Sequence, residues 1–232
     1  MAHSKQFLIT NDQLDAQLNE IKNRIKLHMN GIAADAMRAS GLLYQKNYGV
    51  GLPALKNMAR NIHPSADLAN RLWLTGWRET YILSILLHPI EKLSMQQAYS
   101  RALTAPTYEV QQLLAQQLLA HTAFATHLCT LLLDSENHTG LSVAFLLATR
   151  ISPALPQSLC ADLIERGILL SETTHFNLYT SISKCFGRLC RLNSATKIQL
   201  LALQTKWQYS THKSQQCIAN EIQTELDFLN EM

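Results

Sequence analysis

The sequence predicts an all-α fold, a solenoid of stacked helix pairs. Only eight glycines and six prolines interrupt 232 residues, and apolar residues recur every three or four positions in almost every long segment. Strand-like alternation is nowhere sustained. Successive helix pairs are spaced by about 30 to 40 residues, the range of degenerate HEAT or armadillo-like units. No crisp repeat consensus is visible, so a compact irregular helical bundle is the alternative.

The first elements are two helices followed by a glycine-containing loop. Apolar spacing predicts a helix from about residue 12 to 29 and a short helix near 33–40. Two glycines place residues 44–52 in a loop, and Pro53 suits the first turn of the next helix. His63-Pro64 then ends that helix.

The rest of the chain predicts ten further helices joined by short connectors. They span approximately residues 65–75, 77–88, 94–103, 107–120, 123–134, 138–151, 156–167, 173–191, 194–206 and 213–230. The residues that punctuate them, in positions suited to caps and turns, are Pro89, Pro106, Pro153, Pro156, Gly167 and Asn193. We expect one helical-repeat domain over residues 1–232.

The composition argues against a membrane protein and against a metal site. No apolar run reaches the roughly 20 residues of a spanning helix, and residues 1–10 lack the apolar core of a secretory signal, so we expect a cytoplasmic protein. Five cysteines without a CxxC pair indicate free, mostly buried thiols. Nine histidines show no HExxH motif, and we expect neither a metal nor a cofactor.

The charge is distributed unevenly along the chain. The formal net charge is only +3, yet residues 173–220 contain no Asp or Glu. The basic residues of this interval are Lys184, Arg188, Arg191, Lys197, Lys206 and Lys213. A local excess of positive charge fits a polyanionic partner and fits an ordinary solvated surface equally well.

Three segments, in the same order along the chain, resemble a known family. The first runs Gly41-Leu-Leu-Tyr-Gln-Lys-Asn-Tyr-Gly-Val-Gly-Leu-Pro-Ala-Leu-Lys56, the second is Arg78-Glu79-Thr80-Tyr81, and the third runs Lys184-Cys-Phe-Gly-Arg-Leu-Cys-Arg191. Together they resemble the HEAT-like DNA alkylation repair proteins, the AlkD-type alkylpurine glycosylases. The resemblance implies a right-handed α-α superhelix whose concave face holds duplex DNA.

The sequence departs from this family at the residues that excise bases. The resemblance places Gln112 where the family carries its catalytic aspartate, Ser142 near its arginine and Arg188 at a cleft tryptophan. A neutral amide cannot offset the positive charge that develops on the sugar during base loss, so we expect no base excision. A register shift of one residue would make Glu109 the surviving acid, and an active glycosylase using Glu109 is the alternative.

The candidate DNA-binding residues lie in three segments. Lys184, Arg188 and Arg191 stand at i, i+4 and i+7 and are expected on one helix face, which could also be an ordinary solvated face. The other candidates are Lys46 and Tyr48 in the first loop, and Tyr108 and Gln112 at the start of a later helix.

A fourth segment carries two tryptophans at helical spacing. Trp73 and Trp77 could form an aromatic face, but packing between repeats is the stronger interpretation. Arg78-Glu79 is expected to be a structural ion pair.

The sequence therefore leaves three functional hypotheses open. The leading one is a DNA alkylation repair relative that binds duplex DNA independently of sequence, through backbone contacts, without excising bases. The second is the active glycosylase, and the third is a scaffold with a protein partner in its groove. No membrane partner is expected.

Overall fold

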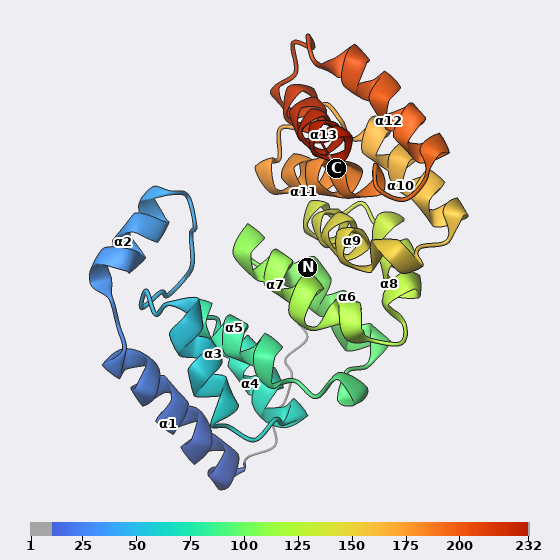
Figure 1. Cartoon of the computed structure of the whole chain (residues 1–232). Helices are drawn as coiled ribbons and strands as arrows, with labels where there is room; N and C mark the ends of the chain where they lie inside the picture. Colours follow the sequence, from blue (N-terminus) through green and yellow to red (C-terminus); the bar gives the residue numbers. More distant parts are fainter. Residues whose placement is uncertain (1–10, 232) are drawn as a thin grey trace. The chain divides into compact units, whose positions relative to one another are not determined.

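The structure is a computed structural model that describes residues 11–231, so the first ten residues, from which the lack of a secretory signal was predicted, lie outside the described part. Within residues 11–231 the chain forms thirteen α-helices (Figure 1), which confirms the all-α prediction. They are α1 (Asp12–Leu27), α2 (Gly31–Ala39), α3 (Leu52–Arg60), α4 (Ala66–Thr75), α5 (Arg78–Leu87), α6 (Met95–Thr104), α7 (Tyr108–Gln117), α8 (Ala125–Leu133), α9 (His138–Ile151), α10 (Gln157–Leu169), α11 (Phe176–Leu189), α12 (Ser194–Trp207) and α13 (Lys213–Asn230). Three short 3-10 helices also occur there: η1 (Ile90–Lys92), η2 (Leu119–His121) and η3 (Ser152–Ala154).

Most helix starts follow from capping side chains. An Asn, Ser or Thr oxygen accepts a hydrogen bond from the amide three residues later, which satisfies one of the free donors of the first turn. These caps are Asn11, Asn30, Ser65, Ser94, Thr107, Asn137 and Asn193. Pro53 lies in the first turn of α3, as predicted. The capping residues explain why the predicted helix starts agree closely with the structure.

Several predicted helix bounds differ from the structure by two or three residues, and two of the differing positions have a clear physical reason. The helix predicted from residue 173 begins at Phe176, because His175 has extended backbone angles and forms the cap. Gly167, expected to end a helix, lies inside α10. Its role is packing, because a Cβ at this position would lie 2.4 Å from Cζ of Phe186 on α11.

The chain divides into two compact units, Met1–Pro89 (unit 1) and Ile90–Met232 (unit 2). In unit 1, α4 packs against α5, while α3 contacts α5 and α1 contacts α4. The core between them contains Leu68, Leu72 and Leu83, all fully buried. The single domain expected over the whole chain stays a prediction.

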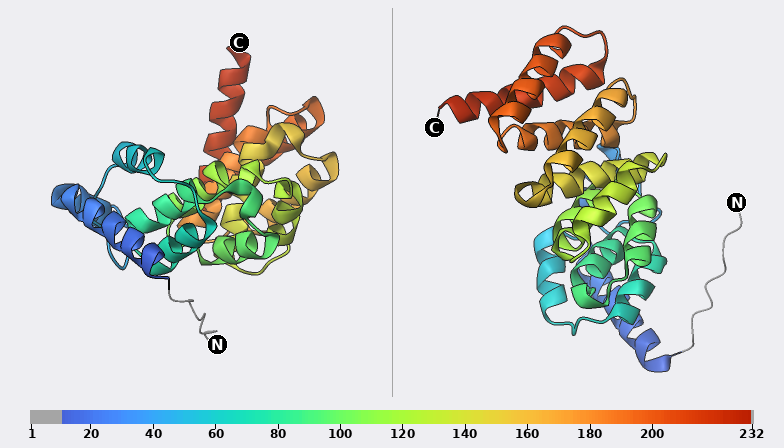
Figure 2. Two further views of the ribbon diagram at one scale, coloured as in Figure 1. Left: turned by 90° about the horizontal axis from the view of Figure 1, so that it is seen from below. Right: turned by 90° about the vertical axis from the view of Figure 1, so that its right-hand side faces the viewer.

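In unit 2 every second helix belongs to one row. Within this row α7 contacts α9, α9 contacts α11, and α11 contacts α13, while α6 and α8 pack on α9 and α12 packs on α13. The views in Figure 2 show α12 and α13 at the end of unit 2 that carries the C-terminus. The apolar stripe predicted for α11 is confirmed, because Leu178, Ile182, Phe186 and Leu189 are all fully buried. This packing fixes which side of α11 remains accessible.

The five cysteines are free, as predicted, and all except the half-buried Cys217 are buried. In the part of the chain that the structure describes, no three His, Cys, Asp or Glu side chains gather as a metal site would require. None of the helices described between residues 11 and 231 has the length and apolarity to cross a membrane.

Candidate nucleic-acid interface

Two of the predicted cations, Lys184 and Arg188, lie half-buried on α11 and are held by neighbouring elements of unit 2. Lys184 Nζ lies 5.4 Å from the ring centroid of Tyr108 at the start of α7, a cation–π contact. Arg188 Nε donates a hydrogen bond to Ser152 Oγ in η3 at 3.2 Å. The structure thus brings Tyr108 and Lys184 together, and it holds two positive charges one helical turn apart.

Arg191 does not continue this face. It lies beyond the end of α11 at Leu189, and its Nε and Nη2 atoms contact Glu225 Oε2 on α13 at 2.7 and 2.5 Å. Its guanidinium carbon also lies 5.0 Å from the ring centroid of Phe228. The expectation that three cations share one helix face is therefore wrong for Arg191, because the helix ends before it and α13 packs beside it. Its role in DNA binding stays a prediction.

In the folded chain, acidic side chains lie next to the acid-free interval, residues 173–220. A Cβ at Gly187 would lie 3.0 Å from Glu225 Cγ and 3.1 Å from Glu221 Cγ, so α13 places two carboxylate side chains against one side of α11. Sequence reasoning missed this because the acids follow the interval in the chain. Lys184 and Arg188 instead contact Tyr108 and Ser152, on the side of α7 and η3.

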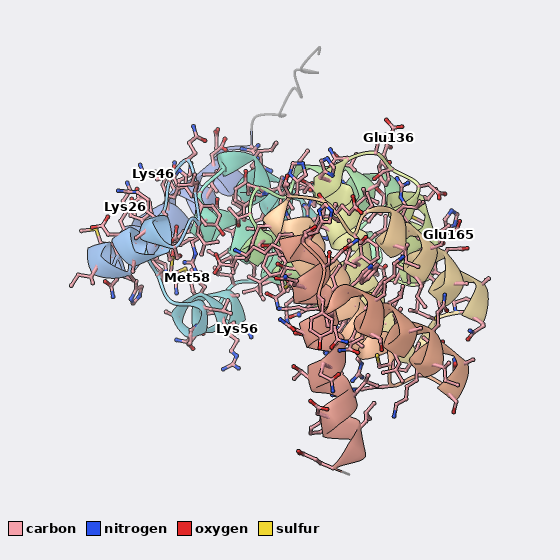
Figure 3. The ribbon with its side chains drawn as sticks, turned by 90° about the horizontal axis from the view of Figure 1, so that it is seen from above. Lys26, Lys46, Lys56, Met58, Glu136 and Glu165 are labelled. Carbon is pink, nitrogen blue, oxygen red and sulfur yellow. The ribbon has the colours of Figure 1, made fainter. Side chains whose placement is uncertain are left out.

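Further acidic residues of unit 2 gather around α8 and α10. A pocket of about 300 Å³ is lined there by Asp134, Asp162 and Glu165, together with Arg166. Figure 3 labels Glu165 and, just before α9, Glu136. Unit 2 therefore carries acidic side chains around α8 and α10 in addition to those of α13 beside α11.

A neutral hydrogen-bond network occupies the region next to Gln112. Ser142 Oγ on α9 lies 2.8 Å from Gln111 Oε1 and 2.7 Å from Ser181 Oγ, and all three residues are buried. Gln111 Nε2 donates to the carbonyl oxygen of Ala105 at 3.3 Å. Gln112 itself is half-buried on α7. Ser142, which the sequence places near the family's arginine, thus lies in a network of neutral groups.

Two histidines and an aromatic cluster lie beside this network. The rings of His138 and His175 lie 3.9 Å apart, and with Gln111 they line a pocket of about 230 Å³. Phe176 lies 6.5 Å from Tyr108, ring to ring. Burial raises the pKa of Tyr108 to about 12, so its hydroxyl stays protonated at neutral pH. Glu109 is half-buried in the first turn of α7.

In unit 1 the predicted residues Lys46 and Tyr48 belong to a cation–aromatic cluster. Lys46 Nζ lies 5.2 Å from the Tyr48 ring centroid and 4.8 Å from that of Trp77. The rings of Tyr48 and Trp77 are 5.1 Å apart, and Lys22 Nζ approaches Trp77 at 5.7 Å. We call Lys22, Lys46, Tyr48 and Trp77 the cationic cluster of unit 1.

A buried ion pair positions the loop that carries this cluster. Glu79 Oε1 accepts hydrogen bonds from the amides of Tyr48 and Val50 at 3.1 and 3.2 Å. Arg78 Nη1 donates to the Val50 carbonyl at 2.8 Å and lies 3.5 Å from the Glu79 carboxylate. Both side chains are almost fully buried. The structural ion pair expected from the sequence is confirmed, and it anchors the loop.

Sequence reasoning missed two members of the cluster. Trp77 was expected to pack between repeats but belongs to the cluster, whereas Trp73 makes an edge-to-face contact with Tyr81 of the adjacent helix α5, at 4.9 Å. Lys22 lies in α1, too far along the chain for its contact with Trp77 to be foreseen. One signal was present, because residues 21–66 contain seven basic residues and one acidic residue.

Comparison with known proteins supports the fold. No protein-family model and no curated protein matches this sequence. One solved structure superposes with a TM-score of 0.74 at 14% sequence identity, covering 91% of this chain and 94% of the other. It is described as representing a new family of proteins related to the HEAT-like repeat DNA glycosylases, with affinity for branched DNA structures. The chain therefore has the fold of the HEAT-like repeat DNA glycosylases and their relatives.

Proposed function

We propose that the protein binds DNA through backbone contacts and does not excise bases. The observation that carries the proposal is the pair Lys184 and Arg188, held in place on α11 by Tyr108 and Ser152. Cations fixed one helical turn apart suit successive phosphates, and release of counterions from DNA makes such binding sensitive to salt. The cationic cluster of unit 1 provides a second group of lysines that lie against aromatic rings.

The structural neighbour's affinity for branched DNA suggests which form of DNA this chain binds. We infer that this chain also binds branched DNA, because it shares the fold and carries positive charge in both units. Contacts to the backbone carry no sequence information, so the expected binding is independent of sequence.

The proposed lack of excision is supported by the residues around Gln112. Excision requires a charge that stabilises the developing oxocarbenium sugar. Gln112 is neutral, and the adjoining network of Gln111, Ser142 and Ser181 contains only amide and hydroxyl groups. Glu109, half-buried at the start of α7, is the carboxylate through which excision would have to occur.

The test of DNA binding is a salt titration with the double variant Lys184→Ala/Arg188→Ala. We expect weaker binding to any duplex and a salt slope reduced by about two, one for each lost phosphate contact. The matched control is Lys197→Ala/Lys206→Ala, which removes the same charge from α12 and should leave the slope nearly unchanged. Equal effects of the two variants would contradict this location of the interface.

The test of excision is an assay of base release from alkylated duplex at high protein concentration. We expect no released purine from the wild-type chain. Release that disappears in Glu109→Gln would overturn the proposal in favour of a glycosylase.

A further inference from the structure

The turn between α1 and α2 exposes a group of large apolar side chains. Leu27, Met29 and Ile32 are 83%, 67% and 86% exposed. Of the five large apolar side chains exposed in the described part of unit 1, four lie between residues 27 and 43. Single exposed apolar residues are common, but a contiguous group marks a contact surface. We call Leu27, Met29 and Ile32 the apolar tip.

The apolar tip is rigidly supported. Asn30 lies within it and caps α2, and its amide donates to the Tyr48 carbonyl at 2.8 Å. Gly49, with a φ of +69°, permits this approach, because a Cβ there would lie 2.1 Å from the Asn30 carbonyl oxygen. The loop is in turn held by the buried Glu79 carboxylate. These contacts hold the turn in one position although its apolar side chains face solvent.

The surroundings of the tip are strongly positive. Arg24 and Lys26 lie in the last turn of α1, directly before Leu27. The only acidic residue between positions 21 and 66, Asp35, lies 3.4 Å from Arg38. Lys26 and Lys46 of this region are labelled in Figure 3. Charge complementarity therefore favours a polyanion as the partner of the tip.

Apolar side chains flanked by cations fit DNA at a point where base stacking is interrupted. Proteins insert such side chains between base steps, while cations hold the adjoining phosphates. A membrane surface also takes apolar and basic groups, but it suits a longer amphipathic helix, and α2 has nine residues with only Ala34 buried. The chemistry of the tip therefore favours unstacked bases.

We propose that the apolar tip contacts the unstacked bases of a DNA branch point, with Arg24 and Lys26 on the flanking phosphates. This inference rests on the proposed DNA binding and adds to it a site in unit 1 that distinguishes branched from continuous duplex. In this proposal the α1–α2 turn determines the preference for branched DNA over continuous duplex. The cations supply the affinity for the DNA backbone.

The experiment compares a three-arm DNA junction, with 2-aminopurine at the branch, and a continuous duplex of equal length. The variant is Leu27→Ser/Ile32→Ser, which alters two exposed side chains. The matched control is Leu169→Ser/Ile198→Ser, which alters two exposed apolar residues of unit 2 (69% and 68% exposed). Thermal unfolding verifies that both variants fold.

We expect the wild-type chain and the control to raise 2-aminopurine fluorescence and to prefer the junction. The tip variant should lose the fluorescence change and about tenfold in junction affinity, with duplex affinity within about twofold. An unchanged preference, or binding of phosphatidylserine vesicles that the tip variant abolishes while the junction is still bound, would overturn the inference. Duplex binding without a fluorescence change refutes this inference alone, whereas no binding to either DNA refutes the proposed function as well.

Discussion

At the scale of single residues, the buried pair Arg78 and Glu79 anchors the loop that precedes α3. Two ionised groups removed from water are stable only when each partner and its hydrogen bonds are present. Glu79 accepts hydrogen bonds from the backbone amides of Tyr48 and Val50, and Arg78 donates one to the carbonyl of Val50. The pair thus couples the core of unit 1 to the loop that carries Lys46 and Tyr48.

We expect Glu79→Gln to lower the free energy of unfolding by about 3–5 kcal/mol, because the substitution removes a buried carboxylate that lies 3.5 Å from the buried Arg78 guanidinium. Urea denaturation measures this change. The control is Asp35→Asn, which removes an exposed ion pair with Arg38 and should change stability by less than about 1 kcal/mol. Similar stabilities of the two variants would contradict the anchoring role of Glu79.

The thiols provide a second prediction for single residues. Burial raises the pKa of Cys129 to about 12 and that of Cys190 to about 11. Only the thiolate reacts rapidly, so these thiols should be inert toward a disulfide reagent at pH 8. The half-buried Cys217 should react first, and all five should react in denaturant. Mass spectrometry of the labelled chain identifies the site, and early labelling of Cys129 would contradict the buried packing.

At the scale of elements, the contact between α10 and α11 depends on Gly167. We expect Gly167→Ala to destabilise the protein by about 1–3 kcal/mol, because the new methyl group would overlap the buried Phe186 ring. The control is Gly31→Ala, where no atom lies within 4 Å of the added carbon. Denaturant midpoints compare the two, and equal stability would show that α10 moves freely away from α11.

The adjacent rings of His138 and His175 predict a pH dependence of the stability of unit 2. Partial desolvation, and secondarily the nearby His175, lowers the pKa of the exposed His138 from its ordinary value of 6.5. The unfolded chain then binds more protons than the folded chain just below that value, so stability is full above pH 6.5 and falls as the pH decreases through the lowered pKa. His138→Gln should flatten this decline. Unfolding midpoints between pH 5 and 8 provide the measurement, and an unchanged decline would assign it to other groups.

The sequence predicted the helices well, because capping residues and apolar spacing act within a few positions. Asn193 and Pro53 were correctly placed at helix starts for this reason. The site was less predictable, since its partners are distant in the chain. The Glu225 partner of Arg191 and the Lys22 partner of Trp77 come from other helices, and local spacing contains no information about them.

At the scale of the whole molecule, the modest net charge conceals two strongly basic intervals, one in each unit. Residues 21–66 carry seven cations and one acid, and residues 173–220 carry six cations and none. Because the net charge of the chain is only +3, the remaining residues are net negative. This separation favours an oriented encounter with a polyanion, and it raises the question of whether one DNA molecule contacts both intervals.

Salt titrations of combined variants answer that question. If one duplex contacts both units, Lys22→Ala/Lys46→Ala and Lys184→Ala/Arg188→Ala should each reduce the salt slope by about two, and the four substitutions together by about four. If only unit 2 binds DNA, the unit 1 pair should leave the slope unchanged, and the fourfold variant should match the unit 2 pair. Binding by gel shift at four salt concentrations, with Lys197→Ala/Lys206→Ala as the charge-matched control, separates these outcomes. We expect the unit 2 pair to reduce the slope, because Lys184 lies against the Tyr108 ring and Arg188 is hydrogen-bonded to Ser152 in fixed positions. A slope that falls equally in the control would show that net charge alone, and not the position of these cations, determines the salt dependence.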